Sequence, residues 1–172
     1  SDTAGGTLNL KSGLGGSGDF AVNDGVIKTT GAATVIANGT GNLTQSTTTT
    51  SITGNAGVTL GGANIGTAAN PIVFEAGGNT VSASASSGGI YLKQATGNLL
   101  TSKYVLSNGG TGQTISLATV DGSITVDSTA GFNANTVNDI FSFTTAGTVQ
   151  DIAFASGVTL TAANLNLAGT GN

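Results

Sequence analysis

Glycine interrupts this 172-residue sequence at short intervals along almost its whole length. There are 29 glycines, and the longest stretch without one runs from Phe132 to Ala146. A glycine inside a helix costs about 1 kcal/mol relative to alanine, so long helices are disfavoured almost everywhere. Between the glycines lie short runs in which β-branched and polar residues alternate, such as "TLNL", "TVI" and "SITV". These runs predict strands of about three to five residues, and therefore an all-β chain.

The strand-like runs resemble one another. "GGTLNL", "AGVTL", "GGIYL", "GQTISL", "DGSITV" and "SGVTL" each combine a small or polar turn with an apolar/polar alternation that ends on Leu or Val. Self-similar short strands between Gly and Asn turns are typical of a solenoid, in which stacked rungs share one apolar column. At about 20 residues per rung, residues 1–172 are expected to form a single continuous parallel β-helix of about eight rungs.

An antiparallel β-sandwich is the alternative fold. Two Asp-Gly dipeptides, Asp24-Gly25 and Asp121-Gly122, are of the type that closes two-residue hairpins. The stretch "VNDGVI" (22–27) is the better hairpin candidate of the two, so the sandwich stays open at this point.

Pro71 is the only proline of the chain and lies in "NIGTAANPI" (64–72). Proline has no N–H to donate and biases the preceding residue, Asn70, toward extended conformations. It cannot therefore sit in the middle of a central strand. We expect it at a corner of the solenoid, just before a strand at Ile72–Phe74.

The composition argues against several classes of function. The chain has no His, Cys or Met, which removes the usual zinc, copper, haem and iron–sulfur ligands and the Ser-His and Cys-His catalytic pairs. A formal net charge of −4 with no Arg argues against nucleic-acid binding. No apolar run approaches the ~20 residues of a membrane-spanning helix, so no membrane insertion is expected. The start without Met suggests a processed product or an excised segment.

Paired carboxylates are the one constellation that suggests catalysis, since a β-helix with two such groups can cleave polysaccharides. Asp121 and Asp127 are the candidates, with Asp139 and Asp151 more distant. Asp121 belongs to an Asp-Gly turn and Asp127 follows a strand, both common positions for turn residues. The turn interpretation is favoured, so no catalytic, cofactor or metal site is expected.

Other local motifs are weaker. "GGTGQTISL" (109–117) lacks the aspartate of a calcium-binding repeat, and "STTTTS" (46–51) has no rung period of the kind that ordered threonine arrays require. Asn38-Gly-Thr and Asn42-Leu-Thr fit glycosylation acceptors, although such triplets arise readily in this composition.

The segment from Ala63 to Leu100 resembles the repeats of filamentous-haemagglutinin-type exoproteins of Gram-negative bacteria. These repeats contain Ile-Gly-Thr, then Asn-Pro-Leu or Asn-Pro-Ile, an Ala/Ser-rich strand, a Gly-Gly-x-Ile-Tyr-Leu strand and a Gly-Asn/Asp-Leu strand. The matching residues are Ile65, Gly66, Thr67, Asn70, Pro71, Ile72, Gly88, Gly89, Ile90, Tyr91, Leu92, Gly97, Asn98 and Leu99. The close match covers less than a quarter of the chain.

The resemblance implies a right-handed parallel β-helix within a large bacterial surface or secreted protein. It implies a structural or adhesive role, with no enzymatic activity, outside the cell or on its surface. Expected partners are neighbouring β-rungs of the parent chain or of identical subunits, and a glycan or surface receptor. Two other functions stay open: a self-assembling extracellular fibre subunit joined by strand addition, and a carbohydrate-active β-helix enzyme.

Overall fold

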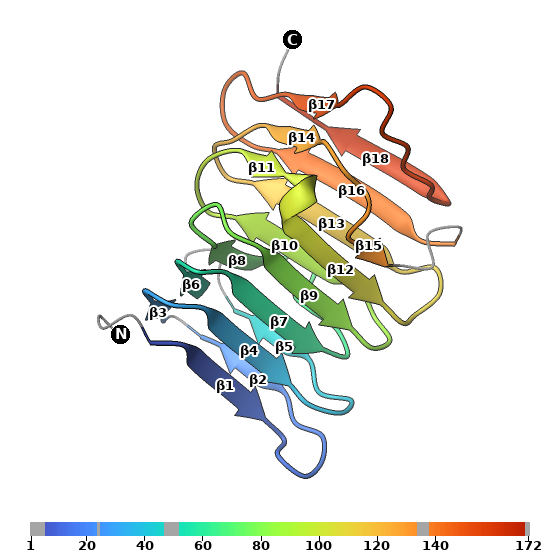
Figure 1. The fold of residues 1–172 in the computed structure, drawn as a ribbon. Helices are drawn as coiled ribbons and strands as arrows, with labels where there is room; N and C mark the ends of the chain where they lie inside the picture. Colours follow the sequence, from blue (N-terminus) through green and yellow to red (C-terminus); the bar gives the residue numbers. More distant parts are fainter. Residues whose placement is uncertain (1–5, 24, 47–51, 134–137, 171–172) are drawn as a thin grey trace.

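The computed structural model describes residues 6–23, 25–46, 52–133 and 138–170, and shows a parallel β-solenoid (Figure 1). Every pairing between the described strands is parallel. The all-β, parallel prediction is therefore confirmed. The only helical element among the described residues is the short 3₁₀ turn η1 (Thr101–Lys103).

Four sheets make up the coil. One has six strands: β1 (Leu8–Ser12), β4 (Ala33–Ala37), β7 (Val58–Gly62), β9 (Val81–Ala85), β12 (Tyr104–Asn108) and β15 (Phe132–Asn133). A second has seven: β3 (Ile27–Thr29), β6 (Ile52–Gly54), β8 (Ile72–Glu75), β10 (Ile90–Gln94), β13 (Thr114–Thr119), β16 (Ile140–Thr145) and β18 (Asn164–Ala168). The other two are β2 (Phe20–Val22) with β5 (Leu43–Gln45), and β11 (Leu99–Leu100) with β14 (Ile124–Val126) and β17 (Ile152–Phe154).

The solenoid has about six turns, fewer than the eight expected from the sequence. Leu8 pairs with Ala33, and Ala33 pairs with Val58, so each of these turns takes 25 residues. The corners are longer than the strand spacing suggested, and longer corners consume chain without adding a rung.

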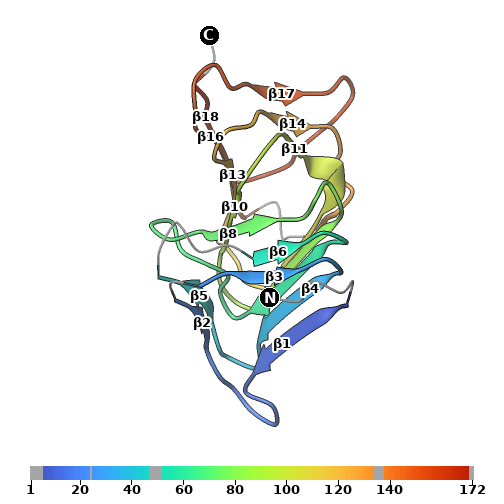
Figure 2. The same cartoon turned by 90° about the vertical axis from the view of Figure 1, so that its left-hand side faces the viewer.

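The coil is right-handed, as the family resemblance implied. In Figure 1 the strands β1, β4 and β7 lie in front and run to the lower right, whereas β10, β13 and β16 lie behind and run back. Figure 2, seen from the left-hand side of that view, shows these two faces on opposite sides of the coil. The chain climbs toward the C-terminus as it passes from one face to the other. Right-handed crossovers are the rule for parallel strands.

The cross-section of the coil changes midway, at the segment that contains Pro71. Ile65 forms single bridges to Leu43 of β5 and to Ile90, the first residue of β10. Ile72 of β8 pairs with Leu92 of the same β10. Ile65 and Ile72 thus lie on either side of a loop in one turn. Their partners in the next turn, Ile90 and Leu92, lie close together in the same strand, β10. Pro71 lies just before β8, so its predicted corner position is confirmed.

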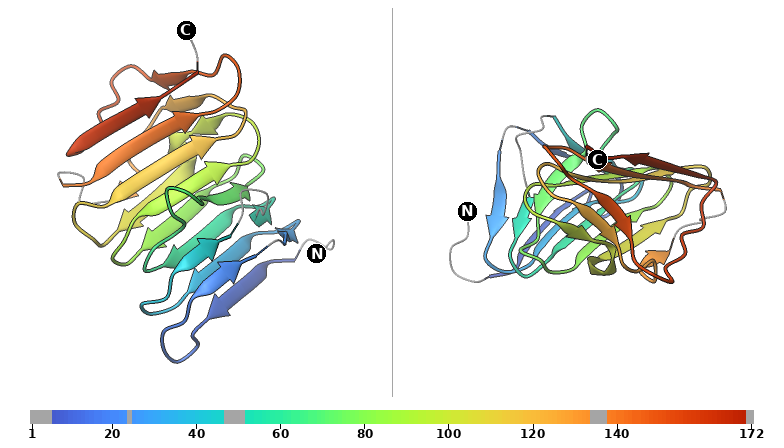
Figure 3. Two further views of the ribbon diagram at one scale, coloured as in Figure 1. Left: turned by 180° about the vertical axis from the view of Figure 1, so that it is seen from behind. Right: turned by 90° about the horizontal axis from the view of Figure 1, so that it is seen from above.

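The interior is one apolar column, formed because inward residues alternate with outward ones along each strand. β4, for example, buries Ala33, Val35 and Ala37 and turns Thr34 and Ile36 outward. Farther along, Phe141 and Phe143 are fully buried, and Phe141 stacks on Phe132 with ring centroids 5.5 Å apart. Figure 3 shows from behind and from above how the sheets wrap around this interior.

The sandwich alternative is wrong. The strands that flank the hairpin candidate, β2 and β3, do not pair with each other: β2 pairs with β5 and β3 with β6. Asp24 itself lies outside the described residues. Asp121-Gly122 joins β13 to β14, which belong to different sheets.

Candidate functional site

The carboxylates predicted as catalytic candidates lie at corners of the coil and accept hydrogen bonds there. Asp121 precedes β14 and its Oδ1 accepts a hydrogen bond from the Gly97 N–H of the preceding turn at 2.9 Å. Asp127 follows β14, where it accepts hydrogen bonds from the Ser102 N–H (2.8 Å) and the Ser102 hydroxyl (2.7 Å). The two carboxylates therefore lie at opposite ends of one strand, and both are engaged with backbone of the neighbouring turn. This supports the turn interpretation.

The same arrangement recurs at two other aspartates. Asp139 is fully buried and its Oδ1 accepts the Gln113 N–H at 3.0 Å. Asp19 accepts the Asn42 N–H of the next turn at 2.7 Å. Corner N–H groups have no ladder partner, and a carboxylate supplies the acceptor that the sheet cannot.

Asp127 has a pKa below its ordinary value. Burial raises this pKa, but the hydrogen bonds from Ser102 and from the Thr101 hydroxyl favour the charged form. Together these bonds lower the pKa by more than burial raises it. The carboxylate is thus held ionised in a structural contact.

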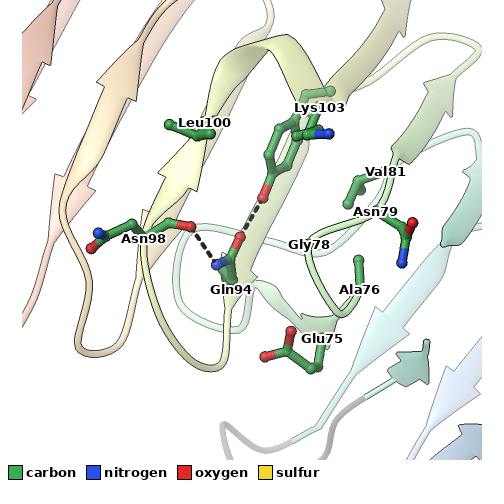
Figure 4. Close-up of a pocket in the computed structure, with 10 residues that line it drawn as sticks. Glu75, Ala76, Gly78, Asn79, Val81, Gln94, Asn98, Leu100 and Lys103 are labelled. Carbon is green, nitrogen blue, oxygen red and sulfur yellow. Dashed lines mark hydrogen bonds between the residues drawn. The ribbon is translucent and has the colours of Figure 1, made fainter. Parts of the chain in front are cut away.

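A small polar corner lies where β10, β11 and η1 meet (Figure 4). Gln94 is its centre: its Nε2 donates to the carbonyls of Thr96 (2.8 Å) and Asn98 (2.9 Å), and its Oε1 accepts the Tyr104 hydroxyl at 2.9 Å. Glu75 also serves this corner, since it accepts hydrogen bonds from the Gly77 N–H and the Thr96 hydroxyl.

The free space at this corner is about 70 Å³. Ligand pockets usually measure about 300–1,000 Å³, so the corner has room for water but not for a substrate. Burial, with a smaller effect from the Glu75 charge, raises the pKa of Tyr104 far above its ordinary value. The phenol therefore stays a neutral hydrogen-bond donor.

A larger hollow lies beside the loop of residues 66–71. The loop closes on itself through the Thr67 N–H to Asn70 carbonyl bond (3.0 Å) and the Asn70 N–H to Thr67 hydroxyl bond (3.0 Å). Gly66 has a φ of +65°, and a Cβ there would lie 2.7 Å from the Tyr91 carbonyl oxygen, so only glycine starts the loop without a clash. In Figure 3 this loop is the green segment that stands out from the coil.

The hollow encloses about 400 Å³. The polar and aromatic side chains around it come from four successive turns, because strand alternation and register bring outward residues together: Asn42, Thr44, Asn64, Thr67, Tyr91 and Gln113. Among the described residues, none that lines it is charged.

The outer face of the six-stranded sheet carries small hydroxyl side chains. Thr34, Thr59 and Ser82 are in register on successive turns. Uncharged residues stacked in this way do not repel one another, so a low charge content suits a solenoid surface.

The C-terminal edge of the described structure is apolar and unpaired. β18 pairs on one side only, with β16, which places Leu165 beside Phe141 and Leu167 beside Phe143. Leu165 is 43% exposed and Leu167 is 51% exposed, although both continue rows that are fully buried in the preceding turn.

Other sequence motifs have structural roles or fall outside the described residues. Asn38 Nδ2 donates to the Ser12 carbonyl at 2.7 Å, and Asn42 contacts Asp19, so both acceptor-type asparagines are engaged with the coil. Most of "STTTTS" (46–51) lies outside the described residues. In the described ranges, no group of three or more His, Cys, Asp or Glu could hold a metal ion. None of the helical structure seen in those ranges is long and apolar enough to span a membrane.

The hollow beside the loop was not predicted from the sequence. Tyr91 was noted only as part of the repeat motif, and Asn42 only as the first residue of a glycosylation triplet. Neither Asn64 nor Gln113 was singled out as a candidate site residue. Their 22-residue spacing, from 42 to 64 and from 91 to 113, is close to one turn and was the available sign. It acquires meaning only once the register is known.

No family model, no curated protein and no solved structure matches this chain. The functional proposal therefore rests on the fold and on the geometry of its surface.

Proposed function

We propose that this chain is a non-catalytic segment of an extracellular bacterial adhesin or filament, in which the solenoid acts as a rod. The open C-terminal edge is the observation that carries the proposal. Leu165 and Leu167 extend buried rows of Phe141 and Phe143, so a further rung would bury them as the earlier rungs bury theirs. A segment whose core continues into neighbouring rungs suits a long rod.

The surface chemistry supports the extracellular part of the proposal. Only 7% of the residues are charged, and the outward row Thr34, Thr59 and Ser82 carries uncharged hydroxyls. Side chains at the corners bond to the neighbouring turn, as Asp121 does to Gly97 and Asp127 to Ser102. Such cross-turn bonds add to the strand ladders and resist local opening, which would protect an exposed rod from proteolysis.

A fibre of identical subunits is supported less well. The first turn has separate strands β2 and β3 with a corner between them, whereas the last turns have long strands such as β16 and β18 at that face. The two ends thus present different cross-sections, which favours rungs of a parent chain over a second copy of this one.

Surface labelling tests the proposal. Antibodies raised against the folded chain should label intact source cells or the culture medium, while antibodies against a cytoplasmic enzyme should label only permeabilised cells. Labelling confined to permeabilised cells would refute the extracellular role. Hydrolysis of a glycan panel that is lost in an Asp121→Asn/Asp127→Asn double variant would refute the non-catalytic role.

A further inference from the structure

The hollow beside residues 66–71 has the chemistry of a carbohydrate site. Tyr91 offers an aromatic ring, and the carboxamides of Asn42, Asn64 and Gln113 lie around it. Asn64 Nδ2 donates to Asn42 Oδ1 and Gln113 Nε2 donates to the Thr111 carbonyl, which leaves the second N–H of each of these two amides for a ligand. A pyranose ring presents an apolar C–H face and a rim of hydroxyls, which an aromatic side chain and amides complement. We propose that this hollow binds a neutral oligosaccharide.

The position of Tyr91 is set by the backbone beneath it. Ile90 and Leu92 are buried, so alternation turns Tyr91 outward. A Cβ on Gly89 would lie 2.6 Å from Cε2 of the Tyr91 ring, which means that the ring lies against the glycine backbone. The aromatic surface is therefore placed before any ligand arrives, and binding has little ordering to offset.

The hollow has room and unused hydrogen-bonding capacity. Its volume of about 400 Å³ falls within the usual range of ligand pockets. Within the part of the chain that the structure describes, the hydroxyls of Thr44 and Tyr91 make no hydrogen bond. Both hydroxyls can therefore serve a ligand.

The charge of the hollow selects the ligand class. None of the described residues that line it is charged, so a carboxylate or sulfate held there would lose hydration without gaining a counter-charge. A neutral saccharide meets no such penalty.

A second hollow, of about 250 Å³, lies on the other side of the same loop, and Lys93 is the one charged residue among its described lining residues. Ala68 and Tyr91 line both hollows, so the ring stands between them. A chain of several sugar units can pass over Tyr91 from one hollow into the other. This makes an oligosaccharide a better ligand than a single sugar.

The inference deepens the adhesive part of the proposed function and rests on it. Surface labelling and glycan binding are separate measurements, so each can fail alone. A surface-exposed chain without this site would still be a rod, and a site on a chain confined inside the cell would leave the rod proposal refuted.

The test is NMR titration of the ¹⁵N-labelled chain with cellotetraose, maltotetraose and tetraacetylchitotetraose at millimolar concentration. At least one of them should shift the amide signals of Asn42, Thr67, Tyr91 and Gln113. A hyaluronan tetrasaccharide, which is acidic, should bind more weakly than the best neutral probe, because only the second hollow offers a counter-charge, from Lys93. Absence of shifts with all three neutral probes, shifts on another face, or binding of the acidic probe alone would overturn the proposal.

Variants locate the contact. Tyr91→Ala should weaken binding about three- to tenfold, whereas Tyr91→Phe should retain most of it. Thr59→Ala, on the outer face of the six-stranded sheet, is the matched control and should bind as the parent chain does. Thr44→Val is the second test variant in case Tyr91→Ala does not fold, and it should weaken binding without altering the amide spectrum elsewhere. Unchanged affinity in a folded Tyr91→Ala chain would refute the site.

Discussion

The side-chain Oδ1 of Asn64 lies 1.5 Å from the point at which a Cβ on Gly88 would stand. The carboxamide thus fills the space that any larger residue at position 88 would need. It also continues a corner ladder, because Asn64 Nδ2 donates to Asn42 Oδ1 at 2.7 Å and Asn42 N–H donates to Asp19. On the next turn the ladder ends at Gly88, because glycine has no side chain to continue it.

Two glycine substitutions should therefore differ in cost. Gly88→Ala meets the end of an exposed side chain, so Asn64 can turn away and the loss should be about 1 kcal/mol, the value of one hydrogen bond. In Gly122→Ala the new Cβ would stand 1.9 Å from the Gly97 carbonyl oxygen, which is backbone, and overpacking of this kind should cost about 3 kcal/mol. Urea unfolding of both variants measures the difference, and equal costs would contradict the model of the corners.

Tyr104 should make the chain sensitive to alkali. Its pKa is raised in the folded chain, so above about pH 10 the unfolded phenol ionises while the folded one does not, and the free energy of unfolding falls as the pH rises. Tyr104→Phe should cost about 1 kcal/mol at neutral pH through loss of the bond to Gln94 and should show a shallower alkaline decline. Thermal unfolding across this range checks both.

Asp127 should contribute to acid sensitivity in the opposite sense. Its pKa is lowered on folding, so its contribution is complete above the unfolded value of about 4 and is lost as the pH falls through the folded value. Asp127→Asn should reduce the free energy of unfolding at neutral pH and flatten its acid dependence. Asp151→Asn, at an exposed position, is the control and should leave the free energy of unfolding at neutral pH unchanged. A profile unaltered by Asp127→Asn would contradict the bonded role of this carboxylate.

The open edge should govern solubility. Leu165→Lys/Leu167→Lys places two charges on the last strand and should suppress concentration-dependent association in sedimentation velocity experiments. Leu14→Lys changes a leucine that is 81% exposed away from this edge and is the matched control. If association persists in the double variant, edge pairing is not its cause.

Val149 should be a site of easy stabilisation. It is a β-branched residue with a φ of +61° in the turn between β16 and β17, and its side chain is largely exposed. Because the left-handed region suits Asn or Gly far better, Val149→Asn should stabilise the chain by about 1 kcal/mol. A lower melting temperature in this variant would contradict the assigned turn.

The sequence alone determined the class of fold and the role of its only proline. Frequent glycines disfavour helices, and short alternating runs of similar pattern require stacking, because no single strand of three to five residues buries enough surface to be stable by itself. Pro71 had to lie at a corner because it lacks a donor. The resemblance of residues 63–100 to a repeat family added the right-handed coil.

The tertiary structure alone decided the number of turns and everything that depends on register. Ile65 and Ile72 align with neighbouring positions of β10, and Asn42, Tyr91 and Gln113 come together around one hollow, only because corners of unequal length set which residues stack. Local patterns predict which side of a strand faces inward, since that follows from alternation. They cannot predict which strand lies above which residue, since this depends on the length of every corner in between.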